Sequence, residues 1–578
     1  MKYTGTTGSA GIAIGKVYLY QRFQPEITME PAGPPDCELL HYRTAQNAAR
    51  KELEALRTRF SETGNSEQTA IFAAQLEILL DETIDEEIRN GISSGECSGA
   101  WVIHSVFEQY AAMFEGLDDP IIQERAADLR DICVRLLRCW ADLPEQNLSA
   151  LPEPVIIVAH DLLPSDTATL DRKNTLGILT ETGGGTSHSA IIARAYEIPA
   201  VLGVSGIVSA LKNRQEVILD AINGKVLTNF SLETRSTYES KRQEYLQQQA
   251  YTKQFIAREP VTPDNVRILV ELNIASAAPQ ELEAVKYTDG AGLFRSEFLY
   301  MGRSAPPTEE EQFQAYRKVL MAYNHRPVIL RTLDIGGDKP LACLDLPKEE
   351  NPFLGERALR LCFRHPEIFH TQLRAALRAS SFGQLWLMFP MVSSMEDLRR
   401  AKACLERAKE ELRSERVPFR EDLKTGMMIE VPSIALLADQ AAKEADFASI
   451  GTNDLIQYLT AADRGNPAVS DYYQAYHPAV FRLIRYVARY FAAQGKPVGV
   501  CGEMGGNLLA ATVLIGLGIR QLSVGAASVA AVKQMISSTS CEKAEELAKT
   551  VCGLSTAGEV YQYLREKVTL SHSFIGGS

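Results

Sequence analysis

Apolar residues in the first quarter of the chain recur at helical spacing. Intervals of three or four residues separate Ala45, Ala49, Leu53, Leu56 and Phe60, so these side chains share one stripe of a helix. The same pattern continues over residues 71–88, 100–114 and 125–140. Amphipathic helices joined by short links bury such stripes against one another, so we predict a helical bundle between about residues 38 and 142.

Short strands are predicted before and after this bundle. The first twenty residues are rich in glycine and β-branched side chains, which favours one or two short strands. After Pro152, the apolar runs 155–159 and 176–180 have the length of strands. The pair Asn223-Gly224, which lies between apolar runs in 216–228, indicates a hairpin. Residues 232–258 are charged and glutamine-rich, which predicts an exposed connecting helix.

The second half of the chain alternates short apolar runs with amphipathic stretches. The runs occupy residues 267–273, 291–296, 328–334, 385–392, 425–431, 447–453, 497–503 and 521–525. Eight strand–helix units in roughly 310 residues fit a (β/α)8 barrel, for which about 250 residues is typical. A doubly wound open sheet needs fewer strands and usually carries an early glycine-rich dinucleotide turn, which this sequence lacks. We therefore predict an α/β multidomain protein with a C-terminal (β/α)8 TIM barrel.

Length and charge narrow the class of protein. A chain of 578 residues is too long for a single core, so two to four domains are expected. The formal net charge of -13 disfavours a general nucleic-acid surface but allows a focused arginine pocket. We expect a cytoplasmic protein without membrane insertion, because no leader or membrane-length apolar run is recognisable and the ten cysteines are scattered without CxxC pairs.

Reactive side chains of barrel enzymes lie at the carboxyl ends of the strands, and five predicted strands end on such residues. They are Arg295 on the second strand, Arg331 with Asp334 on the third, Glu430 on the fifth, Asn453 and Asp454 on the sixth, and Cys501 with Glu503 on the seventh. Strand ends are often polar, but arginines and acids on five strands indicate one shared site.

The types of residue indicate the ligand. Planar, permanently charged donors for phosphate and carboxylate are offered by Arg295, Arg331, Arg357 and Arg464. Glu430 and Asp454 offer the hard oxygen ligands that Mg2+ takes together with water and substrate phosphate. For any one arginine taken singly, a surface salt bridge is the favoured interpretation, yet the two sets together predict a phosphorylated carboxylic acid bound through Mg2+.

His188 is the candidate nucleophile. It follows the triplet Gly183-Gly184-Gly185 and precedes a helical stretch, and such a turn lets the backbone approach an anion at a helix start. Thr186 or Ser187 is placed to cap that helix, and a neutral imidazole can attack phosphorus. A single histidine is more often an ordinary core or surface residue, so both interpretations remain open on this context alone. The Walker spacing is absent, so no P-loop nucleotide site is indicated.

Longer segments resemble one family. GGGTSHSAIIARAYEIPAVLG is similar to the phosphohistidine segment of Enzyme I of the bacterial phosphoenolpyruvate-dependent phosphotransferase system and of its relatives pyruvate phosphate dikinase and phosphoenolpyruvate synthase. Six later segments resemble the barrel motifs of Enzyme I in order and spacing: LFRSEFLYM, RTLDIGGDKP, ENPFLGERALR, GMMIEVPS, SIGTNDLIQYLTAADRGN and GVCGEMGG. Two further segments, GSAGIAIGKV and ERAADLRDI, resemble its N-terminal half. A dikinase or synthase needs a further ATP-binding domain, whereas only 187 residues precede His188. The layout therefore favours Enzyme I, a phosphoenolpyruvate–protein phosphotransferase.

The resemblance implies a plan of domains. Residues 1–30 and 145–230 would form a swivelling β/α phosphohistidine domain. An inserted helical bundle, residues 31–144, would dock the small phosphocarrier protein HPr. Residues 231–260 would form a linker helix, and residues 261–578 the barrel that binds phosphoenolpyruvate and forms a homodimer.

The resemblance also implies a role for each site residue. Phosphoenolpyruvate would bind at the barrel mouth, with Mg2+ held by Glu430 and Asp454. The phosphate would be held by Arg295 and Arg331, and the carboxylate and remaining oxygens by Arg357, Asn453, Asp454 and Arg464. His188 would attack phosphorus through Nε2, supported by Thr167, Gly183, Gly184 and Thr186. Cys501 would protonate the enolate to give pyruvate.

The phosphoryl group would then pass to a histidine of an HPr-like carrier as the first step of sugar uptake. A regulatory paralogue with a different HPr-like partner is the alternative, although such proteins often carry an added sensory domain that this sequence lacks. Two positions depart from the family pattern. Gly185 stands where sugar-system members usually have arginine, and Gln75 stands where a well-known member has histidine.

Overall fold

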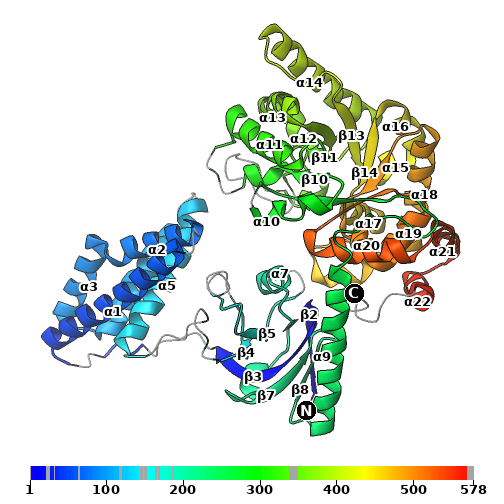
Figure 1. The fold of residues 1–578 in the computed structure, drawn as a ribbon. Helices are drawn as coiled ribbons and strands as arrows, with labels where there is room; N and C mark the ends of the chain where they lie inside the picture. The colour runs from blue at the N-terminus through cyan, green and yellow to red at the C-terminus, as the bar shows by residue number, and fades with distance from the viewer. Residues whose placement is uncertain are drawn as a thin grey trace. The chain divides into compact units, whose positions relative to one another are not determined.

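The computed structural model describes most of the chain. The described residues are 2–20, 27–30, 33–62, 66–115, 120–143, 148, 151, 153–162, 166, 170–184, 187–277, 279–301, 303, 305–336 and 349–568. The chain divides into two compact units between Tyr245 and Leu246, inside the helix α9 (Leu232–Lys253). Figure 1 follows the chain by colour from one unit to the other.

The helical bundle is confirmed in the N-terminal unit. It contains α1 (Pro35–Glu62), α2 (Ser66–Leu79), α3 (Glu82–Ser94), α4 (Gly99–Glu115) and α5 (Pro120–Trp140), drawn from blue to cyan in Figure 1. The predicted stripe of Ala45, Ala49 and Leu53 lies in its buried core. The stretch 71–88 is divided at Asp81, whose side chain caps α3 by accepting hydrogen bonds from the first turn.

A mixed β-sheet accompanies the bundle in this unit. Its strands are β1 (Lys2–Thr4), β2 (Thr6–Ser9), β3 (Ile12–Tyr20), β4 (Val155–Ala159), β5 (Thr175–Thr180), β6 (Ala200–Leu202), β7 (Glu216–Asp220) and β8 (Lys225–Thr228), in the order β1-β8-β7-β3-β4-β5-β6-β2. The first twenty residues hold three strands, where the composition predicts one or two. Because β3 pairs in parallel with β4, the bundle is an insertion between two neighbouring strands.

The helices α7 (His188–Ala195) and α8 (Ile207–Ala210) pack against the sheet through separate clusters of buried residues. The predicted hairpin is confirmed, because β7 and β8 pair antiparallel. Its turn contains Gly224 at φ +61°, where a Cβ would lie 2.3 Å from the carbonyl oxygen of Gly5. The predicted connecting helix is α9, whose residues are mostly exposed.

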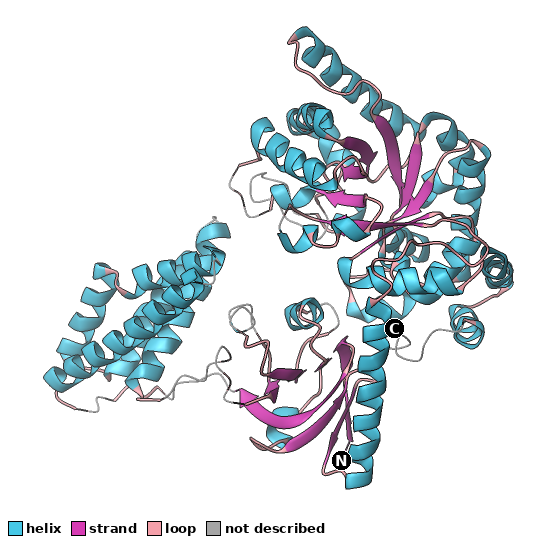
Figure 2. Ribbon diagram, viewed as in Figure 1, coloured by secondary structure: helices cyan, strands magenta, loops and turns pink. Residues whose placement is uncertain are grey.

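The C-terminal unit is the predicted (β/α)8 barrel, a closed ring of strands surrounded by helices (Figure 2). Its parallel strands are β9 (Leu269–Ile274), β10 (Ala291–Arg295), β11 (Pro327–Arg331), β12 (Gln384–Phe389), β13 (Lys424–Ile429), β14 (Phe447–Ile450), β15 (Val498–Val500) and β16 (Gln521–Val524). Each of the eight apolar runs overlaps one strand, so the strand count and order of the prediction are confirmed.

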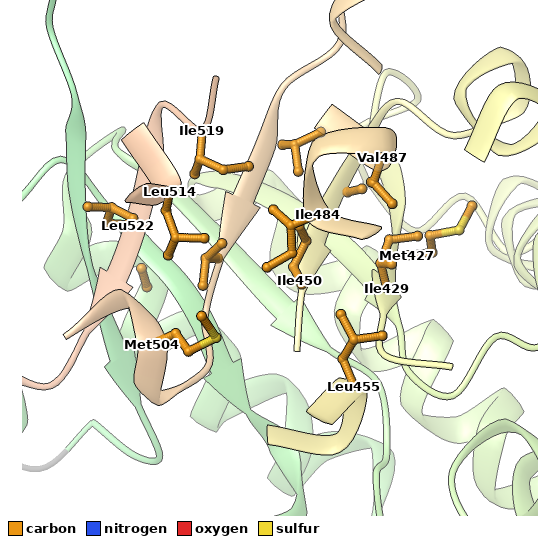
Figure 3. Packing of buried hydrophobic residues seen from close by; sticks show 14 of the residues in the cluster. Met427, Ile429, Ile450, Leu455, Ile484, Val487, Met504, Leu514, Ile519 and Leu522 are labelled. Atoms are coloured by element: carbon orange, nitrogen blue, oxygen red, sulfur yellow. The ribbon is translucent and has the colours of Figure 1, made fainter. Parts of the chain in front are cut away.

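The helices of this unit cover the outside of the ring. They are α10 (Pro279–Leu282), α11 (Glu309–Tyr323), α12 (Leu359–Arg364), α13 (Pro366–Ala379), α14 (Met395–Ser414), α15 (Pro432–Leu436), α16 (Ala438–Glu444), α17 (Thr452–Thr460), α18 (Pro478–Ala493), α19 (Leu508–Gly516), α20 (Val529–Ser538), α21 (Cys541–Gly553) and α22 (Ala557–Lys567). Figure 3 shows Ile450 of β14 beside Ile484 of α18, within the largest core of the molecule.

A smaller apolar cluster fills the inside of the barrel. It includes Leu293, Ile329, Met428 and Phe447, with Cys501 at its edge. The barrel is therefore a packed support, and ligands have access only beyond the strand ends. Among the helices that the structure describes, none is both long and apolar enough to span a membrane.

Candidate active site at the barrel strand ends and the histidine loop

The barrel brings the predicted residues to one end of its strands. Arg295 and Arg331 are the last residues of β10 and β11, and Glu430 and Cys501 directly follow β13 and β15. These positions are as the sequence predicts. Asn453 and Asp454 differ, because β14 ends at Ile450 and both residues lie in the first turn of α17.

Two buried arginines form one ion-pair network. Arg331 contacts Glu297 (Nη2 to Oε1, 2.5 Å) and Asp334 (Nη1 to Oδ2, 2.6 Å). The other oxygen of Asp334 accepts a hydrogen bond from Arg357 (Nη2 to Oδ1, 2.9 Å). All four side chains are less than a tenth exposed. Because each oxygen of Asp334 binds a different arginine, this acid fixes the spacing between the two guanidinium groups.

The network extends to α17. Asp454 Oδ1 lies 3.4 Å from Arg357 Nη1 and 3.8 Å from Arg464 Nη1. Arg357 also donates to the hydroxyl of Tyr458 (3.3 Å), which donates to the carbonyl of Phe353 (2.5 Å). Residues that are far apart in the sequence therefore meet in one chain of contacts, and the prediction that Arg357, Asp454 and Arg464 share a site agrees with this geometry.

Burial and nearby carboxylates have opposite effects on the pKa of Arg331 and Arg357, whereas both raise the pKa of Glu430. Burial lowers the pKa of Arg331 and of Arg357, but neighbouring carboxylates, Asp334 foremost, outweigh it and hold both above the usual range. Burial, with Asp334 and Asp454 adding to it, raises the pKa of Glu430 to about 8. A cation beside Glu430 would offset this penalty on its charged form.

Several buried polar atoms of this cluster have no hydrogen-bond partner within the described part of the chain. They are Glu430 Oε2, Arg331 Nε, Arg357 Nε and Thr452 Oγ1. Buried polar groups in folded proteins are nearly always hydrogen-bonded. A group of such atoms at the strand ends of a barrel therefore indicates that a polar ligand completes the site.

Two carboxylates suit a divalent cation. Glu430 Oε1 accepts the N–H of Met391 (2.6 Å), which leaves Oε2 as the oxygen without a partner. Mg2+ is commonly held by one or two carboxylates together with water and substrate phosphate, so Glu430 and Asp454 fit such an ion. No cluster of three or more His, Cys, Asp or Glu residues arranged for a metal occurs among the described residues.

Cys501 is a buried thiol at the inner edge of this site. Its side chain is 3% exposed, and its sulfur lies 3.7 Å from the carbonyl oxygen of Ile450. Burial raises the pKa of Cys501 to about 11, although the positive charges of Arg331 and Arg295 act in the opposite direction. The thiol is therefore protonated at neutral pH and able to donate a proton.

Asn453 is held in place by Glu503. The side-chain amide of Asn453 donates to Glu503 Oε1 (3.4 Å), and its Oδ1 accepts the main-chain N–H of Glu503 (3.0 Å). The hydroxyl of Tyr473 donates to the carbonyl of Asn453 (3.2 Å). These contacts fix the loop after β15 to the start of α17.

The histidine loop follows β5. His188 is the first residue of α7, and Ser187 is the N-cap, whose hydroxyl accepts the N–H of Ala190 (3.3 Å). Of the two predicted caps, Ser187 is thus confirmed. Gly183 has φ +92°, which favours glycine, and Gly184 is exposed. Thr167, Gly185, Thr186 and the side chain of His188 lie outside the described residues.

The sequence reasoning missed three polar residues that touch this site. Glu297 pairs with Arg331, Tyr458 hydrogen-bonds Arg357, and the side-chain amide of Asn273 donates to the carbonyl of Cys501 (3.1 Å). Asn273 lies near the end of β9, so the strand-end rule applied to every strand would have found it. For Glu297 and Tyr458 the only indication was their place inside segments already singled out.

Three family models match the chain. They are the PEP-utilising enzyme N-terminal domain over residues 4–125, the mobile domain over 151–224 and the PEP-binding domain over 249–541. Two proteins named phosphoenolpyruvate-protein phosphotransferase, from Bacillus sp. (strain S) and Bacillus subtilis (strain 168), are each 42% identical to the chain. The alignments cover 98% and 97% of this chain and 98% and 99% of those proteins. A solution structure titled Enzyme I covers 42% of the chain at 36% identity, with 99% of its own length matched and a TM-score of 0.38. The chain therefore belongs to the family of PEP-utilising enzymes that includes the phosphoenolpyruvate-protein phosphotransferases.

Proposed function

We propose that this chain transfers the phosphoryl group of phosphoenolpyruvate to His188 and then to a histidine of an HPr-like phosphocarrier protein, releasing pyruvate. The observation that carries this proposal is the buried network of Arg331, Asp334 and Arg357, beside which several polar atoms have no partner among the described residues. Phosphoenolpyruvate carries a phosphate and a carboxylate, the two groups that arginine binds best.

Different arginines bind the two charged groups of the substrate. Arg295 and Arg331, at the ends of β10 and β11, bind the phosphate, while Arg357, Arg464 and Asn453 bind the carboxylate and the remaining oxygens. The ion pairs to Asp334 and Asp454 hold Arg357 in place before substrate arrives. Catalysis of phosphoryl transfer is largely positioning and charge stabilisation, which such a prearranged cluster supplies.

Glu430 and Asp454 are the proposed ligands of Mg2+, which neutralises phosphate charge when it is bound. The unpartnered Oε2 of Glu430 and the position of Asp454 in the first turn of α17 support this role. Asp454 also contacts Arg357 and Arg464, so the same acid orients the arginines that bind the substrate.

Transfer to His188 breaks the bond between phosphorus and the enol oxygen and forms a bond from phosphorus to Nε2. The enolate then takes a proton on carbon from the thiol of Cys501, which gives pyruvate, and the thiolate regains its proton from solvent. The buried, protonated state of Cys501 supports this role.

The histidine domain carries the phosphoryl group onward. His188 begins α7, where free N–H groups favour an anion, and Thr167, Gly183, Gly184 and Thr186 support the loop. Since one histidine reacts with both the barrel substrate and the carrier, the proposed phosphohistidine domain, residues 1–30 and 145–230, swivels between them. Residues 231–260, which contain α9, serve as the linker.

The bundle, residues 31–144, is the proposed docking site of the carrier. A groove on its surface is lined by Arg50 and Arg57 of α1, by Leu76 of α2 and by Leu80, which follows α2. Glu54 and Glu77 also line it, and Glu54 pairs with Arg50 at 2.8 Å. Gln75 is buried in α2 beside this groove-lining segment. The barrel, residues 261–578, is the proposed homodimerisation domain, and the cytoplasm is the proposed compartment of a first step in sugar uptake.

Labelled phosphoenolpyruvate tests the central claim. With Mg2+, the purified chain should acquire a label that is stable to base and labile to acid, as expected of phosphohistidine, and His188→Ala should acquire none. Offering several HPr-like carriers to the labelled protein then identifies the partner and separates sugar uptake from a regulatory relay. An unlabelled wild type, or a label that persists in His188→Ala, would contradict the proposal.

A further inference from the structure

The two oxygens of Glu430 have different surroundings. Oε1 accepts the main-chain N–H of Met391 at 2.6 Å, while Oε2 is buried and has no hydrogen-bond partner among the residues the structure describes. Glu430 itself is 0% exposed. Rotation of the carboxylate would therefore break the hydrogen bond from Met391. Because Glu430 is buried, water would not replace that bond.

Met391 holds its N–H in place through an uncommon backbone conformation. Its φ is +53°, in the left-handed region that few residues other than glycine occupy. The side chain is 3% exposed, and its sulfur lies 3.9 Å from the hydroxyl of Tyr458. Burial of this side chain maintains a conformation that costs energy locally, and the conformation directs the N–H at Glu430.

The backbone of Gly451 packs closely against the second oxygen of this carboxylate. A Cβ at this position would lie 2.9 Å from Glu430 Oε2 and 2.9 Å from Met428 Sδ. The φ of Gly451 is -83°, which any residue can adopt. Left-handed geometry therefore does not require glycine here, and the requirement arises from the close approach of this backbone to Oε2 and to Met428.

We propose that Met391 and Gly451 are positioning residues that make Glu430 a one-oxygen metal ligand, with Met391 fixing Oε1 and Gly451 keeping side-chain atoms from crowding Oε2. This inference rests on the proposed function, in which Glu430 holds Mg2+. Hydrogen-bond partners of a metal-ligating side chain tune its affinity for the metal by fixing its orientation. Here the N–H of Met391 fixes one oxygen of Glu430, and the lack of a side chain at Gly451 avoids crowding the other.

Two substitutions and two matched controls test the proposal. Gly451→Ala places a methyl group against Oε2, whereas Gly525→Ala makes the same change after β16, at φ -68° with open space around it. Met391→Val disfavours the left-handed backbone because of its β-branch, whereas Met391→Leu keeps an unbranched Cβ and a similar volume.

Binding of Mn2+ alone is measured from the electron paramagnetic resonance signal of the free ion, and thermal unfolding is recorded in parallel. Gly451→Ala should raise the Kd for Mn2+ at least about tenfold and Met391→Val about fivefold, as expected when the support of a ligand is disturbed, while both controls stay within about twofold. Equal Mn2+ affinity in Gly451→Ala and wild type would overturn the proposal. Wild type that takes no label from phosphoenolpyruvate would instead overturn the proposed function.

Discussion

The two places where the proposed chemistry occurs are built in different ways. At the barrel mouth, Arg331, Asp334 and Arg357 are each less than a tenth exposed and linked by ion pairs of 2.6 and 2.9 Å. At the histidine loop, Ser187 caps α7 with one hydrogen bond and is partly exposed. The first site is held by interlocking buried charges and the second by helix-start geometry.

This difference matches the two tasks proposed for them. A site that stabilises the charge of a transferring phosphoryl group gains from charges fixed in advance. A histidine that delivers the group to two different partners gains from a place at a helix start beside exposed residues such as Gly183 and Gly184. Substitutions should therefore cost much more stability at the barrel mouth than at the histidine loop.

Removing the charge that joins the two buried arginines should have the largest effect. Asp334→Asn replaces one oxygen with an NH2 group that faces a guanidinium and leaves two buried cations short of an anion. We expect the unfolding free energy of the barrel to fall by about 3–5 kcal/mol, as it does when other buried ion pairs are broken. Phosphorylation by phosphoenolpyruvate should fall at least about a hundredfold, since both arginines lose their alignment.

The matched control for this prediction is an exposed ion pair of the same unit. Arg399 and Glu444 lie 2.6 Å apart with side chains 61% and 34% exposed. Glu444→Gln should cost less than about 1 kcal/mol because water screens such a pair. If calorimetry gave equal losses for Asp334→Asn and Glu444→Gln, the network would not be the element that holds the barrel mouth together.

The sequence predicted much of this barrel because its chemistry follows the strand pattern. Each apolar run became a strand, and the rule that reactive groups follow strands placed Arg295, Arg331, Glu430 and Cys501 correctly. The rule failed in detail for Asp454, because a strand of four residues is followed at once by a helix whose first turn carries this acid.

Pairings between loops were not predictable in this way. Arg331 and Glu297 are 34 residues apart, and nothing in the spacing of either segment indicates that they touch. The strands of the first twenty residues were undercounted for a similar reason: β1 pairs with β8 and β2 with β6, so their partners lie about two hundred residues away. Local pattern identifies elements, whereas pairing depends on how distant elements meet.

Glu271 tests how a buried charge affects the stability of the barrel, because this acid of β9 lies near a second acid, Asp289. Burial, with Asp289 adding to it, raises the pKa of Glu271 to about 8. The folded state therefore binds this proton more tightly than the unfolded state does, so the stabilising contribution is complete below the ordinary glutamate pKa and is lost as the pH rises through 8. Wild type should lose about 2–4 kcal/mol of barrel stability between pH 5 and pH 9 from this group alone.

Glu271→Gln keeps the shape of the side chain and cannot ionise. Its unfolding free energy, measured by denaturant titration at both pH values, should lack this part of the pH dependence and exceed that of wild type at pH 9. Parallel pH profiles for the two proteins would show that Glu271 does not titrate in this range and would contradict the prediction.

The smallest expected effect is at the histidine loop. Ser187→Ala removes the hydroxyl that accepts the N–H of Ala190, a loss of about 1 kcal/mol for an N-cap. Ser540→Ala is its match in the barrel, where the hydroxyl accepts the N–H of Lys543 at 3.2 Å to cap α21. Calorimetry should give similar small losses for the two variants, each in its own unit. Only Ser187→Ala should slow the labelling of His188, by about threefold, because the frayed first turn of α7 no longer fixes the histidine. If Ser540→Ala slowed labelling equally, the effect would reflect general stability, and the histidine loop would not owe its geometry to its own cap.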